Sequence, residues 1–394
     1  MIGRGNNSVD SLRTLAATSF ASSAGALMFN TMPIILGVLA ETKGFEEGTL
    51  ASLAAAILVG AFVAVTSAVF WIDKVAWRPV LVLTAMVCLV ASCLIPYTNS
   101  VANIAVLLAL IGFLLGVIYA PTLAALGQAS NPPRAFAISI VVQVIISAIV
   151  AYILPAYLSP KFGSGALTVV VAVCCLVVTL SYPALPTNQK TAPEEGKTAA
   201  PDAIVGATQQ KNGILSLAAM GIFYIGLMGV WDFLERVGVS WSITPVYIGG
   251  VIALALILGG LGALFAAVIG ERAGQVRPVV MAFGFFAIAA TLLGFGSGAL
   301  QFATAVILFN IGWNLSLPFL YAILSSADQS GRLIVLAPAV QTLGAVLGSL
   351  IAGQIVLGIG FNGLYGFFII CALLMLAIHI RVSQTLGGRL SPGV

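Results

Sequence analysis

Apolar stretches of about 20 residues follow one another along this chain, and each is long enough to cross the hydrocarbon core of a bilayer as a helix. Of its 394 residues only 7% are charged, whereas soluble domains carry about 25%. The apolar residues do not alternate in ten-residue strands, as a membrane β-barrel requires. These features exclude a water-soluble globule and predict an all-α membrane protein in a lipid bilayer.

Polar or Pro/Gly clusters separate twelve apolar segments. The predicted spans are 11–40, 48–72, 79–97, 101–128, 135–158, 164–184, 213–235, 244–270, 278–298, 300–326, 333–358 and 362–381. Between the sixth and the seventh lies a stretch rich in Pro, Gly, Gln, Thr, Lys and Glu, which is typical of a flexible linker. We therefore predict an N-terminal six-helix bundle (1–184), a cytoplasmic linker (185–212) and a C-terminal six-helix bundle (213–394).

The distribution of Lys and Arg predicts the orientation, because cytoplasmic loops retain these residues. With both termini and the linker inside, the cytoplasmic side carries Arg4, Arg13, Lys74, Arg78, Arg134, Lys190, Lys197, Lys211, Arg272, Arg277, Arg332, Arg381 and Arg389. The outside carries only Lys43, Lys161 and Arg236. We expect a multi-pass protein of the inner (plasma) membrane with both termini in the cytoplasm. The N-terminal segment lacks a signal-peptide cleavage pattern, so it is expected to remain as the first helix.

The ionisable and metal-binding residues indicate no cofactor. The net charge of +4 comes from singly scattered basic residues, which are topology signals and predict no nucleic-acid partner. The five cysteines lie in apolar stretches without a CxxC pair, and His379 is the only histidine. We therefore expect no disulfide framework, no metal site and no cofactor.

The two halves of the chain repeat each other. Residues 71–81 read WIDKVAWRPVL and residues 269–280 read IGERAGQVRPVV. The matched pairs, which lie about half a chain length apart, are Asp73 and Glu271, Lys74 and Arg272, Arg78 and Arg277, Pro121 and Pro318, Arg134 and Arg332, and Gln143 and Gln341. A parallel repeat of this kind is one of the recurring plans of secondary transporters, with the substrate held near the bilayer midplane between the halves.

At this point the whole chain resembles the major facilitator superfamily. The signature loop of that family reads approximately Gly-x-x-x-Asp-Arg-x-Gly-Arg-Arg, and Asp73, Lys74 and Arg78 occupy its acidic and basic positions. Val69 and Ala76 stand where the two glycines belong, so helix contact at this loop is expected to be looser. The resemblance implies twelve transmembrane helices in two pseudo-symmetric six-helix bundles that move a solute by alternating access.

Both copies of the loop are candidates for a gating latch. An acid at a cytoplasmic helix end, beside bases, can form a charge-assisted network in one arrangement of the halves and lose it in another. The candidate latch residues are Asp73, Lys74, Arg78, Glu271, Arg272 and Arg277. They would stabilise the outward-facing state. The alternative is that they only anchor the cytoplasmic side, with solvated acids.

Polar residues inside the spans are the candidate substrate contacts, because unpaired polar groups are costly in lipid. Gln143 and Gln341 each lie nine residues past a cytoplasmic arginine, which is about 13 Å along a helix and close to the midplane. The spans that carry them, 135–158 and 333–358, border the central cavity in the resembled family. The alternative for each glutamine is a structural bridge between helices.

A second group of candidates suits an aromatic or polyfunctional ligand. Asn310 and Asn314 are four residues apart and share a helix face, and Trp313 lies between them. These side chains can bind a ligand by stacking and hydrogen bonding, or they can hold helices together near Pro318. The weaker candidates are Asn30, Tyr119 and Tyr224.

Asp232 is the one acid within the predicted helical spans that is not at a cytoplasmic loop. A buried carboxyl there could carry a proton. It lies about 28 Å from the inner end of its span, beside Trp231 and followed by Glu235 and Arg236. This position favours an ordinary anchor at the outer interface over a proton site.

These observations lead to a secondary active transporter that moves a small organic solute, with protons as a candidate coupling ion and the chain acting as a monomer. The middle of the spans lacks Lys and Arg, which anionic ligands require, so neutral, amphipathic or aromatic solutes fit better; a weak organic acid stays open. One alternative is a proton-driven multidrug or metabolite exporter, although residues 135–158 lack the glycines of the exporter motif. A membrane-embedded enzyme would need catalytic side chains that come together at one site. The sequence does not indicate such a set, so we expect no enzyme. In a non-transporting receptor, a duplicated latch would have no obvious function.

Overall fold

The structure is a computed structural model that describes residues 11–130, 132–186, 207–269, 274–328 and 332–387. These residues form helices and no strand. The chain divides into two compact units. The N-terminal unit comprises Met1–Lys190 and Pro245–Ala253, and the C-terminal unit comprises Thr191–Thr244 and Leu254–Val394.

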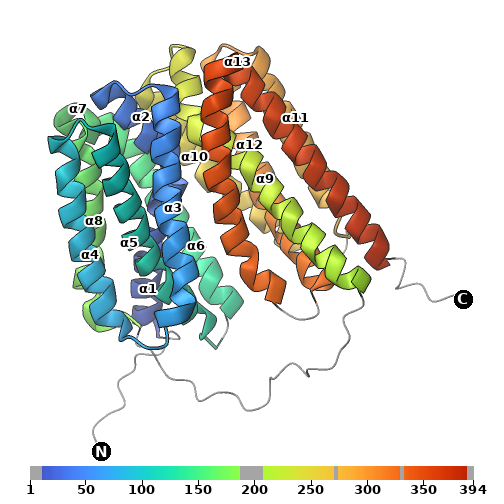
Figure 1. The fold of residues 1–394 in the computed structure, drawn as a ribbon, viewed down its shortest axis with the longest axis horizontal. Coiled ribbons are helices and arrows are strands. Elements are labelled where there is room, and N and C mark those ends of the chain that lie inside the picture. Colours follow the sequence, from blue (N-terminus) through green and yellow to red (C-terminus); the bar gives the residue numbers. More distant parts are fainter. Residues whose placement is uncertain (1–10, 131, 187–206, 270–273, 329–331, 388–394) are drawn as a thin grey trace, which may run out of the picture. The chain divides into compact units, whose positions relative to one another are not determined.

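The N-terminal unit contains most of the shorter helices (Figure 1). They are α1 (Leu12–Asn30), α2 (Met32–Lys43), α3 (Glu47–Trp71), α4 (Trp77–Leu94), η1 (Ile95–Tyr97), α5 (Val101–Gly127), α6 (Pro132–Ile153), the π-helix η2 (Leu154–Leu158), α7 (Ser159–Phe162), α8 (Gly165–Leu180) and η3 (Tyr182–Ala184). Within this unit α1 packs against α5, α6 and α8, and α3 packs against α5. The apolar composition of α1 therefore serves helix contact as well as lipid contact.

The first predicted span is broken. Helices α1 and α2 meet at Thr31 with a bend of 57°. Pro33 has no backbone N–H and cannot complete the hydrogen-bond ladder across this point. The amides of Ile34 and Ile35 both bond to the carbonyl oxygen of Thr31, each at 3.0 Å. The predicted span 11–40 therefore consists of two helices joined at a break beside Pro33.

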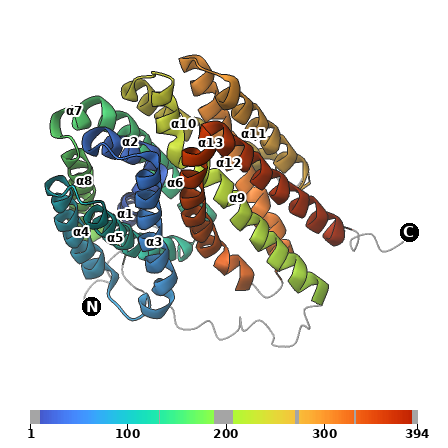
Figure 2. The same ribbon diagram turned by 45° about the horizontal axis from the view of Figure 1, so that its top comes forward.

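The C-terminal unit contains longer helices. They are α9 (Ala207–Ser240), α10 (Pro245–Ile269, of which residues from Leu254 onward belong here), α11 (Arg277–Phe295), α12 (Ala299–Ala327) and α13 (Arg332–Gly387). Helices α9 and α13 pack side by side (Figures 1 and 2). Helix α13 covers two predicted spans and is interrupted at Gly360, whose φ of 73° is left-handed and is accessible to glycine.

Helix α9 is longer than the predicted span at both ends. It begins at Ala207, within the stretch predicted as linker, and Asn212 Nδ2 donates to Thr385 Oγ1 at 2.9 Å, so this polar end pairs with the end of α13. It ends at Ser240 and not at residue 235, because Glu235 and Arg236 neutralise each other inside the helix. This extension moves Asp232 to about 12 Å from the outer end of the helix.

The number of spans remains a prediction. Among the described residues, nine helices are long and apolar enough to cross a membrane, or ten if the bent pair α1 and α2 forms one span. Helix α8 has 16 residues and falls below that length, and α13 counts once despite the break at Gly360. The predicted boundaries of the bundles and of the linker likewise stay predictions.

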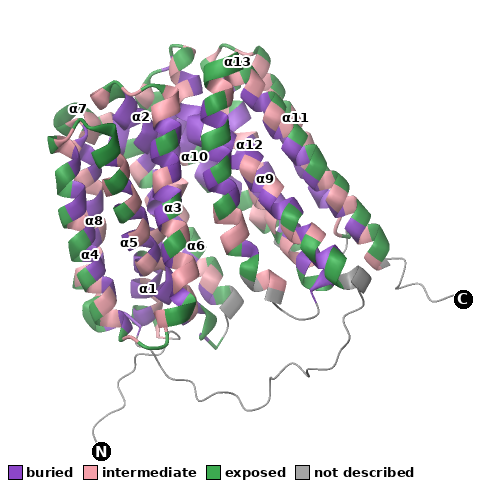
Figure 3. Ribbon diagram, in the orientation of Figure 1, coloured by how far each residue is buried: buried purple, intermediate pink, exposed green. Residues whose placement is uncertain are grey.

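Burial differs strongly from helix to helix (Figure 3). Nine consecutive residues, Met32–Ala40, are buried in α2, and almost every residue of α9 between Ala219 and Leu234 is buried. In contrast, α4 exposes Leu83, Met86 and Val90 on one side. Exposed apolar side chains of this kind are expected where a helix faces lipid.

Candidate substrate and coupling sites

Gln143 bridges two helices of the N-terminal unit. It lies in α6 with 8% of its surface exposed. Its Nε2 donates to Ser22 Oγ of α1 at 2.9 Å and to Ser139 Oγ, one turn earlier in α6, at 3.3 Å. Both amide hydrogens are thus used inside the protein. These contacts match the structural bridge that was the alternative interpretation of Gln143.

Asn30 continues the same contact between α1 and α6. Its Nδ2 donates to Ser147 Oγ at 3.1 Å. Ser139, Gln143 and Ser147 are four residues apart and form one face of α6, and Asn30 stands eight residues beyond Ser22 on α1. We call these five residues the α1–α6 polar seam. It fixes the register of the two helices through directional hydrogen bonds.

Gln341 makes the corresponding contact in the C-terminal unit. Its Nε2 lies 3.2 Å from Met220 Sδ of α9, and its Oε1 accepts a hydrogen bond from the Tyr321 hydroxyl of α12 at 3.1 Å. Gln143 and Ser22, like Gln341 and Met220, are 121 residues apart in the sequence. The repeat therefore preserves the contact between these helix pairs while the partner changes from a hydroxyl to a thioether.

Trp313 and Tyr224 belong to a buried aromatic cluster of the C-terminal unit. The ring of Trp313 lies 6.3 Å from that of Tyr224 and 5.7 Å from that of Trp231, both edge to face. The cluster continues through Phe309, Phe286 and Phe368. Trp313 is 8% exposed and Tyr224 is 5% exposed. Their rings pack mainly against other aromatic rings of the cluster, as in a packed core.

The two asparagines of α12 bond within their own helix. Asn310 Nδ2 donates to the carbonyl oxygen of Val306 at 3.3 Å, and Asn314 Nδ2 donates to that of Asn310 at 2.9 Å. A Cβ added to Gly259 of α10 would lie 2.8 Å from Asn314 Nδ2. The glycine therefore makes room for the amide. Asn314 is partly exposed whereas Asn310 is 1% exposed, so Asn314 is the more accessible of the pair.

Tyr119 lies on α5 and packs against α1. A Cβ added to Gly25 would lie 2.7 Å from the Cβ of Tyr119. Tyr119 is partly exposed. A solute contact at Tyr119 stays a prediction.

Asp232 is fully buried in α9 and does not lie at an exposed interface. Its Oδ2 accepts a hydrogen bond from Ser349 Oγ of α13. The acid three residues later, Glu235, binds Arg236 through both carboxylate oxygens, at 2.6 and 2.9 Å. Burial of this carboxyl removes the main reason for interpreting it as an outer anchor.

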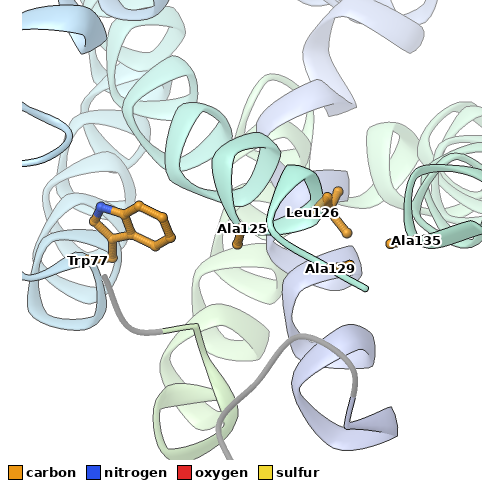
Figure 4. Packing of buried hydrophobic residues seen from close by; sticks show 5 residues of the cluster. All are labelled: Trp77, Ala125, Leu126, Ala129 and Ala135. Carbon is orange, nitrogen blue, oxygen red and sulfur yellow. The ribbon is translucent and has the colours of Figure 1, made fainter. Parts of the chain in front are cut away.

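Trp77, the first residue of α4, belongs to a buried cluster with Ala125, Leu126, Ala129 and Ala135 (Figure 4). Its indole is 1% exposed, and its Nε1 donates to the carbonyl oxygen of Ile72 at 2.7 Å. This packing keeps the first signature loop against the end of α5.

The charged side chains of that loop differ in exposure. Arg78 Nε donates to the carbonyl oxygen of Leu185 at 2.7 Å, so this base binds the chain where it leaves η3. Asp73 and Lys74 are exposed. In the second copy Arg277 is exposed at the start of α11, whereas Glu271 and Arg272 lie outside the described residues. The latch between the two halves stays a prediction.

His379 fastens the second signature loop. Its Nε2 donates to the carbonyl oxygen of Gln275 at 2.9 Å, and Gln275 Nε2 donates to Ser326 Oγ of α12 at 3.4 Å. His379 is 2% exposed. The histidine thus links α13 to the loop before α11, which gives a structural role to the side chain that had no partner in the sequence.

The fold and its comparison with known proteins identify the family. A sequence model of the Major Facilitator Superfamily matches residues 16–337. The chain belongs to the major facilitator superfamily. Membership in this superfamily makes it a multi-pass membrane transporter and not an enzyme. Comparison with curated proteins gave no match.

Solved structures of other major facilitator proteins share the fold. The nucleoside transporter NupG superposes with a TM-score of 0.69 at 13% identity, covering 95% of this chain and 99% of that one. A single-residue variant of NupG gives a TM-score of 0.74 at 12% identity with the same coverage. The human organic anion transporter MFSD10 (TETRAN) gives 0.62 at 15% identity, covering 93% of this chain and 99% of that one.

The side chains that sequence reasoning missed are the partners of the predicted ones. Ser22, Ser139 and Ser147 bind the candidate amides, and the spacing of Ser139, Gln143 and Ser147 at one helix turn is a signal that could have found them. Tyr321 and Ser349 had no such signal, because each contact depends on how two helices pack against each other.

We expect the Gln143 bridge to contribute measurable stability. In a double-mutant cycle of Gln143→Leu and Ser22→Ala, the coupling should be about 0.6 kcal/mol, the mean for hydrogen bonds between membrane helices, and at most about 1.7 kcal/mol. Reversible unfolding in mixed micelles would measure it. A cycle with Gln143→Leu and the remote Ser52→Ala should be additive, because Ser52 bonds only to its own helix. Additivity in the first cycle as well would contradict the bridge.

Proposed function

We propose that this chain is a secondary active transporter of a small, neutral organic solute that carries an aromatic ring and polar edges. In this proposal twelve spans form two six-helix bundles, both termini are cytoplasmic, and alternating access moves the solute across the inner membrane. The positive-inside distribution of Lys and Arg supports the orientation.

The observation that carries the proposal is the pair of glutamines at equivalent positions of the repeat. Gln143 and Gln341 are each fixed by hydrogen bonds to neighbouring helices, so their amides are preorganised. A preorganised amide can recognise a polar edge without losing side-chain entropy on binding. Tyr119 and Asn314, which are partly exposed, supply an aromatic surface and a second amide.

The charge distribution favours a neutral solute over an anion. The described helices carry their Lys and Arg near the ends, and the polar side chains deeper in the spans are amides and hydroxyls. A strongly anionic solute would lack the donor fork that Arg provides. The two structural neighbours represent the two solute classes: NupG is a nucleoside transporter and MFSD10 is an organic anion transporter. Nucleosides are therefore the probe we choose, with organic anions as the opposing class.

Thermal-shift measurements on the purified protein test the solute class. A neutral ligand at about 100 times its Kd should add about 2.7 kcal/mol of stability. Gln143→Ala or Gln341→Ala should each weaken binding about 3- to 12-fold, the cost of one neutral hydrogen bond. Gln354→Ala is the matched control, because Gln354 is an exposed glutamine on the same helix as Gln341. Stabilisation by organic anions alone, or by nucleosides equally in all variants, would contradict the proposed solute or its site.

A further inference from the structure

The start of α9 and the end of α13 lie side by side (Figure 1). Asn212 Nδ2 donates to Thr385 Oγ1 at 2.9 Å, and a Cβ added to Gly226 would lie 2.7 Å from the Cβ of Cys371. Gly226 is as far from Asn212 along α9 as Cys371 is from Thr385 along α13. One antiparallel register of the two helices therefore satisfies both contacts.

This register places two bases on the same side of the helix pair. Lys211 precedes Asn212 by one residue, and Arg381 precedes Thr385 by one turn. Because the helices run antiparallel, both steps turn toward the same side of the line of contact. The bases lie about five residues apart along the pair, which is about 8 Å. Two side chains of this length can therefore reach one anion between them.

Both bases are exposed, and neither has an ion-pair or hydrogen-bond partner among the described residues. The described acids of the C-terminal unit are Asp232, Glu235 and Asp328. Asp232 and Glu235 lie about 30 Å or more from Lys211 along α9. Asp328 accepts a hydrogen bond from the backbone N–H of Ile334. This end of the helix pair thus carries positive charge that no described acid neutralises.

An exposed apolar stripe leads away from the bases along α13. Ala377, Leu374 and Ile370 follow one another from Arg381 at helical spacing, and all three are exposed. Gly366 is the next residue of the stripe, and a Cβ added there would meet no atom within 4 Å. The stripe is about 22 Å long, whereas one leaflet of the hydrocarbon core is about 15 Å thick. One acyl chain can therefore lie along it.

The two bases lie at headgroup depth in the proposed orientation. The predicted spans at this place begin at residue 213 and end at residue 381, so Lys211 and Arg381 lie at the cytoplasmic ends of their helices. Basic side chains at this depth attract anionic lipids of the cytoplasmic leaflet. A negatively charged headgroup with acyl chains matches both the charge of the pair and the stripe beside it.

We propose that Lys211 and Arg381 bind the phosphate of one anionic glycerophospholipid, with an acyl chain along the exposed stripe of α13. The Arg381 guanidinium can bind two phosphate oxygens at once, whereas Lys211 supplies a point charge. The bound lipid links α9 to α13 and stabilises the C-terminal unit. The site does not depend on the transported solute, and only the leaflet that it faces rests on the proposed orientation.

The repeat supplies a matched control for this site. At the offset of the repeat, Arg13 corresponds to Lys211, and Pro183 corresponds to Arg381. Arg13 is exposed near the start of α1. The first half of the chain thus has an exposed base at the equivalent place and lacks the second base. Arg13→Gln removes the same charge from the same predicted side of the membrane without changing the proposed site.

Native mass spectrometry of the purified protein tests lipid binding without any solute. For phosphatidylglycerol, the Kd should rise about fivefold in Lys211→Gln or Arg381→Gln and about 25-fold in the double variant. Arg13→Gln should bind this lipid like the wild type. Phosphatidylcholine with the same acyl chains carries no net charge, so it should bind more weakly and equally to all variants.

Melting temperatures give a second readout. Phosphatidylglycerol should stabilise the wild type more than the double variant, whereas in phosphatidylcholine alone all variants should melt together. An equal loss of binding in Arg13→Gln would show general attraction to a positive surface and overturn the site. Inorganic phosphate that stabilises the wild type as well as phosphatidylglycerol does would refute a lipid as the ligand. None of these results depends on the solute, so the proposed function is tested separately.

Discussion

Gly112→Ala should destabilise the N-terminal unit by about 3 kcal/mol, at the upper end of the cost of overpacking. A Cβ at this position would lie 2.1 Å from the carbonyl oxygen of Ile57, and one at Gly60 would lie 1.9 Å from that of Ala109. Helices α3 and α5 thus approach so closely that backbone meets backbone. A rotamer change cannot relieve such an overlap, so the helices must separate along their length.

The control for this prediction lies on the same helix. Gly127, the last residue of α5, has no atom within 4 Å of the position that its Cβ would take. Gly127→Ala should therefore be neutral or slightly stabilising, by up to about 1 kcal/mol of helix propensity. Melting temperature and monodispersity in detergent measure both variants. Equal stability of Gly112→Ala and the wild type would show that α3 and α5 are farther apart than described.

Trp77→Ala should cost about 3 to 5 kcal/mol, the loss expected when a buried tryptophan is truncated. The indole fills the space between the first signature loop and the end of α5, and it satisfies the carbonyl oxygen of Ile72. Without it the loop loses both the packing and the hydrogen bond. We expect a large fall in melting temperature and increased proteolysis in the stretch Ile72–Ala76.

Two further variants separate packing from hydrogen bonding at Trp77. Trp77→Phe keeps an aromatic ring and loses the N–H donor, so it should cost about 1 kcal/mol. Phe70→Ala removes an aromatic side chain that is 72% exposed and should have little effect in detergent. If Trp77→Ala were as mild as Phe70→Ala, the indole would not hold the loop.

The sequence was sufficient to predict a helical membrane protein and its family, but it was not sufficient to predict which side chains contact each other between helices. Apolar length alone places most helices, because a span needs little more than hydrophobic residues. Ser349 could not be paired with Asp232 in advance, since their contact depends on how α9 and α13 pack. The burial of Asp232 was missed for a related reason: Glu235 and Arg236 look like a helix end, yet by binding each other they let α9 continue to Ser240.

Two pairs of helices are held in register by different kinds of contact. The α1–α6 polar seam consists of directional bonds between fixed partners, such as Gln143 with Ser22, and a small slip would break several of them at once. Between α9 and α13, Gly344 and Gly348 lie so close to the backbone of α9 that a Cβ at either position would overlap a carbonyl oxygen. A slip of one residue there would bring a larger side chain against that oxygen. We therefore expect each pair to move as one rod, the first joined by hydrogen bonds and the second by the close fit of its backbones.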